Sequence, residues 1–212
     1  MLIEDIYSEF KTAYSSLEEI KQLNNDLEAK DIYTNGHSAR VCEYATLIGK
    51  HINLSKEDMK NLRLGSLLHD IGKVAIPNKI LLKKGKLTLE EYEVMKQHPV
   101  IGANILSKTS APSDVILIAK HHHEKYDGTG YPDKLENKKI PYLAQIVSVV
   151  DAYDAMSSKR AYREELDISK IKEEFENCSG TQFSIELTKV FIDILENDYN
   201  KILKIQQKYI EQ

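Results

Sequence analysis

The sequence places histidines beside aspartates, a combination that can bind metal ions. His69 and Asp70 are adjacent, and Asp151 lies in an apolar stretch where its carboxylate should be partly buried. A buried carboxylate needs a partner or a metal ion to offset its lost hydration. One such residue alone would have an ordinary structural explanation. The chain has seven histidines, and those expected at helix ends beside other polar residues are His37, His69, His98, His122 and His123.

Imidazole and carboxylate side chains together suit the hydrolysis of a phosphate ester. Two metal ions about 3.5–4 Å apart can hold a hydroxide and neutralise phosphoryl oxygens. Asp70 could bridge two ions, because a carboxylate has two oxygens. Ligands of this kind without thiolate favour iron or manganese and leave zinc, nickel and cobalt open. Cys42 and Cys178 are too far apart for a zinc motif, and we expect both to be reduced.

The elements that must position these residues are predicted to be helices. Apolar residues recur at helical spacing, and no segment alternates with period two for long. Thr88 with Glu91, and Ser55 with Asp58, resemble capping boxes at helix starts. Helices are expected through Val41 and Ile48, from Ser55 to about Asp70, from Thr88 to about His98 before Pro99, through Ile101 and Ile105, from Val115 to about His123, over 142–157, through Ile171 and Phe175, and over 187–195 and 199–209, with Ser113 or Asp114 capping the fifth. The fold class is therefore all-α.

The first 30 residues form a separate amphipathic segment. Ile6, Phe10, Leu17 and Ile20 fall on one helical stripe, which could pack on the main domain or form a homodimer. We expect a short N-terminal helical extension at 1–30 and one helical catalytic domain at 31–212.

Size and charge exclude several classes of protein. The 212 residues suit one domain with a short extension. A net charge of -4 argues against a globally basic surface for duplex nucleic acid. No apolar stretch is long enough to span a membrane, and the N-terminus lacks a signal pattern. The expected location is cytoplasmic.

Three ordered motifs carry a family resemblance. They are His69-Asp70-Ile71-Gly72-Lys73, then His122-His123-Glu124 followed by the loop Asp127-Gly128-Thr129-Gly130-Tyr131-Pro132, and finally Asp151–Met156 followed by Arg160-Ala161-Tyr162-Arg163. From about residue 31 to about residue 191 the chain resembles the HD-GYP subgroup of the HD phosphohydrolase superfamily. That resemblance implies a helical, metal-dependent phosphodiesterase that converts cyclic di-GMP to linear pGpG and in some cases GMP. Some members prefer cyclic GMP-AMP.

The resemblance also implies the ligand sets. One metal ion would be held by His37, His69, Asp70 and Asp151, and the other by Asp70, His98, His122 and His123. Asp70 would be catalytic as the shared ligand, and Lys73 would contact a phosphate oxygen. His121 would lie beside the ligands or be exposed.

Substrate and partner contacts follow by the same resemblance. Arg160 and Arg163 match family positions that contact the dinucleotide, and arginine suits bidentate phosphate or guanine contacts. The loop residues Gly128, Gly130, Tyr131 and Pro132 would shape the rim of the site and contact partners such as diguanylate cyclases. A purely structural loop is the alternative.

The chain departs from the family pattern at two places. Some members use a glutamate to help bind a third metal ion, and here that position is Tyr33, so we expect two ions. Ser184-Ile185 replaces the usual Asp-Pro, which should alter only a helix cap. Two other functions stay open: a cyclic di-GMP-responsive docking module with little turnover, and a hydrolase of another phosphate ester.

Overall fold

The computed structural model describes residues 19, 20, 22, 24, 25, 27, 36–158 and 165–210. Within these residues the regular elements are helices, with two isolated β-bridges and no strand. The all-α prediction is confirmed. In chain order the helices are α3 (His37–His51), α4 (Lys56–Leu68), η1 (Ile71–Ala75), α5 (Asn78–Leu81), α6 (Leu89–Met95), α7 (His98–Leu106), α8 (Ser113–His121), η2 (Asn137–Lys139), α9 (Tyr142–Ser157), α10 (Ile168–Asn177), α11 (Ile185–Asn197) and α12 (Tyr199–Ile210).

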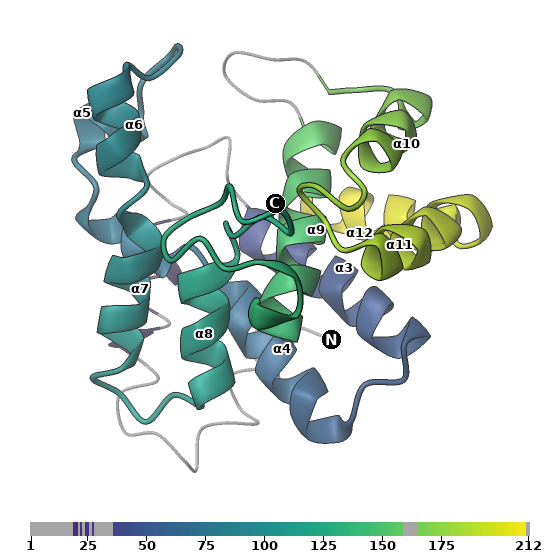
Figure 1. The fold of residues 1–212 in the computed structure, drawn as a ribbon, viewed down its shortest axis with the longest axis horizontal. Helices are drawn as coiled ribbons and strands as arrows, with labels where there is room; N and C mark the ends of the chain where they lie inside the picture. Colours follow the sequence, from purple (N-terminus) through teal and green to yellow (C-terminus); the bar gives the residue numbers. More distant parts are fainter. Residues whose placement is uncertain are drawn as a thin grey trace.

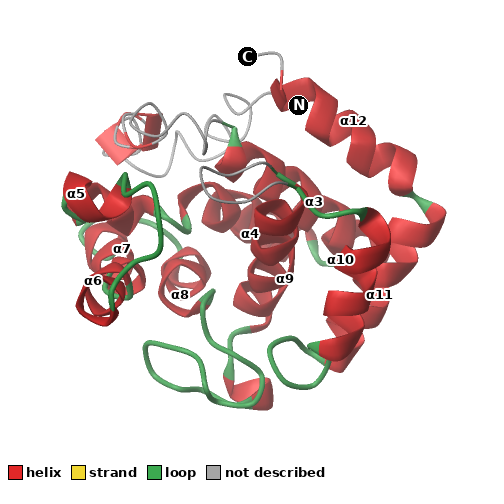
Figure 2. Cartoon of the chain, turned by 90° about the horizontal axis from the view of Figure 1, so that it is seen from above, coloured by secondary structure: helices red, strands yellow, loops and turns green. Residues whose placement is uncertain are grey.

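Helix α9 lies at the centre of the fold. Helices α5, α6 and α7 lie to one side of it, and α10, α11 and α12 lie to the other (Figures 1 and 2). Ile146, Val149, Val150 and Tyr153 of α9 are fully buried in the main apolar core. A helix that is apolar around most of its circumference is stable only inside a protein. A polar residue on α9 is therefore held in a fixed, mostly dry position.

Two helix starts agree with the predicted caps. Ser55 caps α4, and α6 begins with the complete Thr88–Glu91 capping box. Helix α9 spans Tyr142–Ser157 as expected. Ser184 also caps α11, where its hydroxyl accepts a hydrogen bond from the backbone N–H of Leu187. The replacement of the usual aspartate therefore preserves a capped helix start.

Two boundaries were predicted wrongly. The helix after Thr88 ends at Met95, and His98 begins the next helix, with Pro99 in the first turn where the missing N–H costs nothing. Helix α8 begins after Pro112, so neither Ser113 nor Asp114 is its cap, and it ends at His121. The Asp114 carboxylate instead accepts a hydrogen bond from the Asn61 side chain.

The expected N-terminal extension lies largely outside the described residues. Of its described side chains, Ile20 is buried in a second apolar cluster with residues such as Leu67 and Leu106, and Leu27 is also buried. The described part of this segment therefore packs against the domain, while dimerisation stays a prediction. No described helix is long and apolar enough to cross a membrane.

Candidate metal centre

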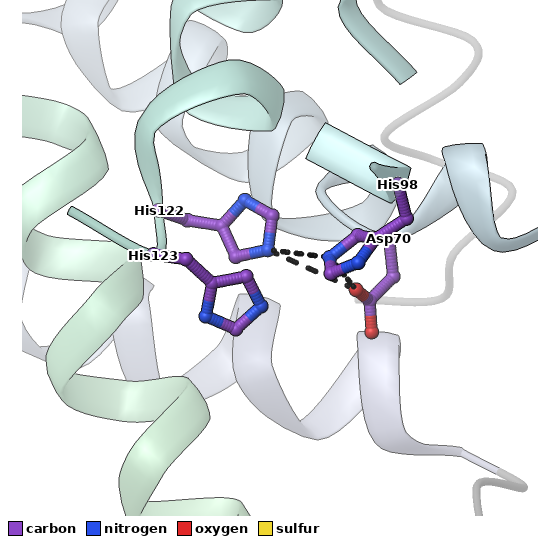
Figure 3. A group of neighbouring side chains, drawn as sticks. All are labelled: Asp70, His98, His122 and His123. Carbon is purple, nitrogen blue, oxygen red and sulfur yellow. Dashed lines mark hydrogen bonds and ion pairs between the residues drawn. The ribbon is translucent and has the colours of Figure 1, made fainter. Parts of the chain in front are cut away.

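The predicted ligands come together where several helix ends meet the middle of α9. His37 begins α3, His69 and Asp70 follow α4, His98 begins α7, and His122 and His123 follow α8. Asp151 projects from α9. Figure 3 shows the side chains of Asp70, His98, His122 and His123 converging from separate elements.

Asp70 lies at the centre of this cluster and faces two sets of imidazoles. Its Oδ1 is 3.2 Å from His98 Nε2 and 3.8 Å from His122 Nε2. Its Oδ2 is 3.4 Å from His69 Nε2 and 3.7 Å from His37 Nε2. Each carboxylate oxygen therefore serves a different group of side chains.

The first group contains Asp70, His98, His122 and His123, whose ligand atoms all lie within 4.8 Å of one another. Hydrogen bonds from Nδ1 fix the orientations of two of these imidazole rings. His98 Nδ1 donates a hydrogen bond to the Met95 carbonyl at 2.8 Å, and His122 Nδ1 donates one to the Ala119 carbonyl at 3.0 Å. With the proton on Nδ1, the Nε2 atom keeps a lone pair that can bind a metal ion.

The second group contains His37, His69 and Asp70, whose ligand atoms also lie within 4.8 Å of one another. Asp151 completes it, because its Oδ1 is 3.4 Å from His37 Nε2 and 4.0 Å from His69 Nε2. His69 Nδ1 donates to the Ser66 carbonyl at 2.7 Å, which turns Nε2 towards Asp70. The structure thus brings together all seven residues expected to bind metal.

The two groups fit divalent metal ions on an observation independent of the motifs. Among the described side chains, His69 Nε2 and Asp70 Oδ1 are buried atoms without a hydrogen-bond partner. Buried polar atoms are costly when unsatisfied, and a cation would satisfy both. Imidazole and carboxylate donors are suitable for iron, manganese or zinc.

Burial and neighbouring charges set protonation states that mostly favour metal binding. Burial and the neighbouring His98 lower the pKa of His123 to about 3. Burial opposes ionisation of Asp70, but the Lys73 ammonium and His69 hold its pKa well below the usual range. Burial also opposes protonation of His37, yet hydrogen bonds to Asp151 and Asp154 raise its pKa to about 9. Metal binding at His37 would therefore release a proton.

Lys73 lies beside the cluster, as expected. Its ammonium contacts Asp70 Oδ2 at 2.5 Å, and about a quarter of its side chain (26%) is exposed. Gly72 makes this placement possible, because a Cβ atom there would lie 1.9 Å from the His98 carbonyl oxygen. The motif glycine thus allows η1 to pack directly on the start of α7, which brings Asp70 to His98.

Two functional residues were missed by sequence reasoning. Asp154 is buried, and its Oδ2 accepts a hydrogen bond from His37 Nδ1 at 2.7 Å. Arg40 donates to both oxygens of Asp154, at 2.6 and 3.0 Å. Their spacing in the sequence could have indicated both residues. Asp154 follows Asp151 by three residues, and Arg40 follows His37 by three. Residues three apart lie on the same face of a helix.

The glycine-rich loop packs against the site. Tyr131 stacks on His123, with ring centroids 4.9 Å apart and an interplanar angle of 25°. Gly130 approaches the backbone so closely that a Cβ atom would lie 2.2 Å from the Lys125 nitrogen. Gly128 adopts a φ of 79°, which favours glycine, and Pro132 is partly buried. The Tyr131 ring thus contributes a wall beside a predicted ligand.

Glu124 holds this loop in place. Its buried carboxylate accepts hydrogen bonds from the backbone N–H groups of Asp133 at 2.7 Å and Leu135 at 3.1 Å. His121 is buried next to it, with Nδ1 3.5 Å from Glu124 Oε1. Of the two environments expected for His121, exposure is wrong. The residues expected to contact the substrate, Arg160 and Arg163, and the residue expected to limit the number of metal ions, Tyr33, lie outside the described residues.

Comparison with known proteins identifies the family. The family model described as "HD domain" matches residues 21–180, so the chain belongs to the HD domain family. The match begins within the segment expected to be an N-terminal extension. Together with the relatives below, it identifies the HD-GYP subgroup that the sequence motifs resemble.

Curated relatives carry names that describe one class of enzyme. The chain is 38% identical over 200 residues to a cyclic di-GMP phosphodiesterase of Thermotoga maritima, covering 91% of this chain and 54% of that protein. It is 42% identical over 149 residues to the cyclic di-GMP phosphodiesterase response regulator RpfG of Xanthomonas campestris, covering 69% and 39%. It is 34% identical over 181 residues to the 3'3'-cGAMP-specific phosphodiesterase 2 of Vibrio cholerae, covering 84% and 35%. The chain thus spans about half, or less, of the length of these relatives.

Solved structures share the fold. An HDG"Y"P protein from Bdellovibrio bacteriovorus aligns with a TM-score of 0.64 at 23% identity, covering 79% of this chain and 53% of that one. A cyclic GMP-AMP phosphodiesterase of Vibrio cholerae, V-cGAP3, aligns with a TM-score of 0.66 at 17% identity, covering 89% and 52%. At these identities the likeness shows the fold alone, and it agrees with an HD-type helical domain.

Proposed function

We propose that this protein is a metal-dependent phosphodiesterase that hydrolyses a bacterial cyclic dinucleotide. The preferred substrate is cyclic di-GMP, with linear pGpG as the first product and GMP as the product of a second cleavage. One observation carries the proposal: a single buried aspartate, Asp70, is shared by two groups of imidazoles that are buried or, for His123, half-buried. This arrangement suits two metal ions bridged by one carboxylate.

The proposed roles follow from the positions of the side chains. The seven residues would hold two divalent ions, which when bound would supply Lewis-acid activation of water and charge neutralisation at the phosphoryl group. His37, His69 and Asp151 orient towards one Asp70 oxygen, and His98, His122 and His123 gather on the side of the other. The Lys73 ammonium lies at the exposed edge of the cluster, where it can contact a non-bridging phosphate oxygen. Iron or manganese is the proposed metal.

The choice of substrate is supported by the names of the relatives. The relatives from Thermotoga maritima and Xanthomonas campestris are named for cyclic di-GMP, and the one from Vibrio cholerae for cyclic GMP-AMP. Cyclic GMP-AMP is therefore the second candidate. Arg160 and Arg163 are proposed to contact the dinucleotide, and the exposed face of the glycine-rich loop to contact signalling partners such as diguanylate cyclases.

The test is hydrolysis of cyclic di-GMP by protein purified without oxygen and loaded with iron or manganese. We expect a linear dinucleotide or GMP to form, and to be absent with Asp70→Ala, because that change removes the ligand common to both groups. Asp193→Ala, on the exposed surface of α11, is the matched control and should behave like the wild type.

Two results would contradict the proposal. Full activity and full metal content in Asp70→Ala would show that Asp70 does not bridge the ions. Binding of cyclic di-GMP by the metal-loaded protein without any product, for either dinucleotide, would instead support a docking module that responds to the messenger.

A further inference from the structure

A cavity of about 320 Å³ opens directly beside the metal centre. His122, His123 and Asp151 are among the residues that line it, so a molecule in the cavity would reach the predicted metal ligands. Its volume lies at the lower end of the range for small-molecule sites in proteins. None of the roles described above uses this space.

The floor of the cavity is a face of α9 with small side chains. Ser148, Ala152 and Ala155 recur at intervals of four and three residues, which places them on one side of the helix. Met156 and Phe183 add apolar walls. A cavity bordered by apolar side chains on more than one side is better suited to a planar aromatic ring than to a hydrated ion.

Polar side chains also line the cavity, namely those of Glu174, Cys178 and Gln182. The Glu174 carboxylate accepts a weak hydrogen bond from Cys178 Sγ at 3.7 Å, and no lysine or arginine of the described part of the chain forms a salt bridge with it. The backbone of Gln182 is held in place, because its carbonyl oxygen accepts a hydrogen bond from the Tyr126 N–H at 3.1 Å. A carboxylate and an amide are thus available to a ligand.

A carboxylate distinguishes between the two purines. Guanine presents two adjacent donors on its Watson–Crick edge, N1–H and the 2-amino group, and one carboxylate can accept both. Adenine presents an acceptor at N1, which a carboxylate repels. Enzymes that act on nucleotides commonly read this edge while the ring is held between apolar side chains.

We propose, resting on the proposed function, that this cavity holds one guanine base of the dinucleotide and that Glu174 determines its specificity. Glu174 would accept hydrogen bonds from the guanine N1–H and 2-amino groups. Phe183 and Met156 would contact the guanine ring, and the small side chains of α9 would leave room for it. The negative charge of Glu174 disfavours a phosphate beside it, so the scissile phosphate would lie near Asp151, His122 and His123.

The experiment separates base recognition from chemistry at the metal centre. Wild type, Glu174→Gln and Glu173→Gln are loaded with manganese. Both glutamates are exposed on α10, but only Glu174 lines the cavity. Affinities for GMP and AMP are measured by calorimetry. Hydrolysis is measured with cyclic di-GMP, cyclic di-AMP and bis(p-nitrophenyl) phosphate, a diester without bases.

We expect Glu174→Gln to lower the preference for GMP over AMP, and kcat/KM for cyclic di-GMP, by about 10- to 100-fold, the range for loss of a bidentate base contact. Hydrolysis of bis(p-nitrophenyl) phosphate should not change, and Glu173→Gln should match the wild type. The inference is overturned if the wild type binds GMP no better than AMP, or if Glu174→Gln keeps the wild-type preference. If the guanine preference depends on Glu174 but no cyclic dinucleotide is cleaved, the base site stands and the proposed function fails.

Discussion

At the scale of single residues, the orientation of the predicted metal ligands depends on neighbouring side chains. His37 is held by Asp154, which is itself held by Arg40 through two hydrogen bonds. Carboxylates behind a metal-binding histidine fix its ring orientation and raise its affinity for the metal. Asp154 is therefore a positioning residue for His37.

Asp154→Asn tests this role. The amide cannot provide two anionic oxygens for His37 and Arg40, so we expect metal affinity to fall by about 10- to 100-fold. Breaking a buried ion pair should also reduce the free energy of unfolding by about 3–5 kcal/mol. Metal titration and denaturant unfolding measure the two effects separately. A destabilised variant that binds metal as tightly as the wild type would limit Asp154 to a structural role.

Lys73→Ala addresses the exposed edge of the cluster. The variant should keep its metal ions and lose about 10²–10³-fold in kcat, because a positioned charge near the phosphate is lost. Metal content and steady-state kinetics are the measurements. Lys79→Ala, an exposed lysine on α5, is the control and should retain the wild-type rate. An equal loss in both variants would point to general electrostatics.

The residues that gather in the cluster were largely predictable, for a physical reason. His69, Asp70 and Asp151 could be selected because polar groups next to apolar runs must be buried and compensated. Asp154 was not selected, because one carboxylate on α9 already explained the pattern there. Tyr131 was expected at the rim as a partner contact, and only packing shows that its ring stacks on His123.

At the scale of elements, the centre depends on close contact between η1 and α7. Gly72 permits that contact, since any side chain there would collide with the His98 carbonyl. Gly72→Ala should push η1 away from α7 and lower the free energy of unfolding by about 3 kcal/mol, at the upper end of overpacking costs. It should also reduce metal content. Chemical denaturation and elemental analysis would show both changes.

Gly85→Ala is the matched control, because a Cβ atom there meets no other atom within 4 Å. Its stability and metal content should equal those of the wild type. If Gly72→Ala also behaved like the wild type, the packing of η1 on α7 could not be what brings Asp70 to His98.

The starts of two helices were predictable because apolar spacing and a cap agreed. Ser55 before α4 and the Thr88–Glu91 box before α6 show this agreement. The boundary at His98 was missed because Pro99 was interpreted as ending a helix, whereas proline is equally suited to the first turn of the next one. A single sequence does not distinguish these two uses of proline.

At the scale of the whole molecule, the centre joins elements from widely separated parts of the sequence. Its side chains come from α3, the α4–η1 connection, α7, the end of α8 and α9. Ions that bind this assembled set should bind the unfolded chain poorly, so they should stabilise the fold.

We therefore expect manganese at about 100 times its dissociation constant to add roughly 2.7 kcal/mol per ion to the free energy of unfolding. Thermal unfolding with added manganese, and again with a chelator, measures the effect. Asp70→Ala should show little response. A wild-type melting temperature that does not change with metal would contradict the assignment of these residues as ligands.

The cavity beside the centre was beyond the reach of sequence reasoning. Its walls come from the residues after α8, from α9, from Glu174 on α10 and from the turn after α10, and no local pattern reports how these elements pack. The small residues on α9 could equally have been read as positions for close helix contact. Only the assembled molecule shows that they border open space.

The glycine-rich loop also joins two parts of the molecule. It begins after α8, stacks on His123 through Tyr131, and is hydrogen-bonded across to the 181–182 turn through the N–H groups of Tyr126 and Asp127. The loop thus acts as a brace between the side of the fold that carries α7 and α8 and the side that carries α10 and α11. The width of the opening between them is set by the length of this brace as well as by the helices. An inserted or deleted residue in it would therefore change which molecules can enter without altering a single metal ligand.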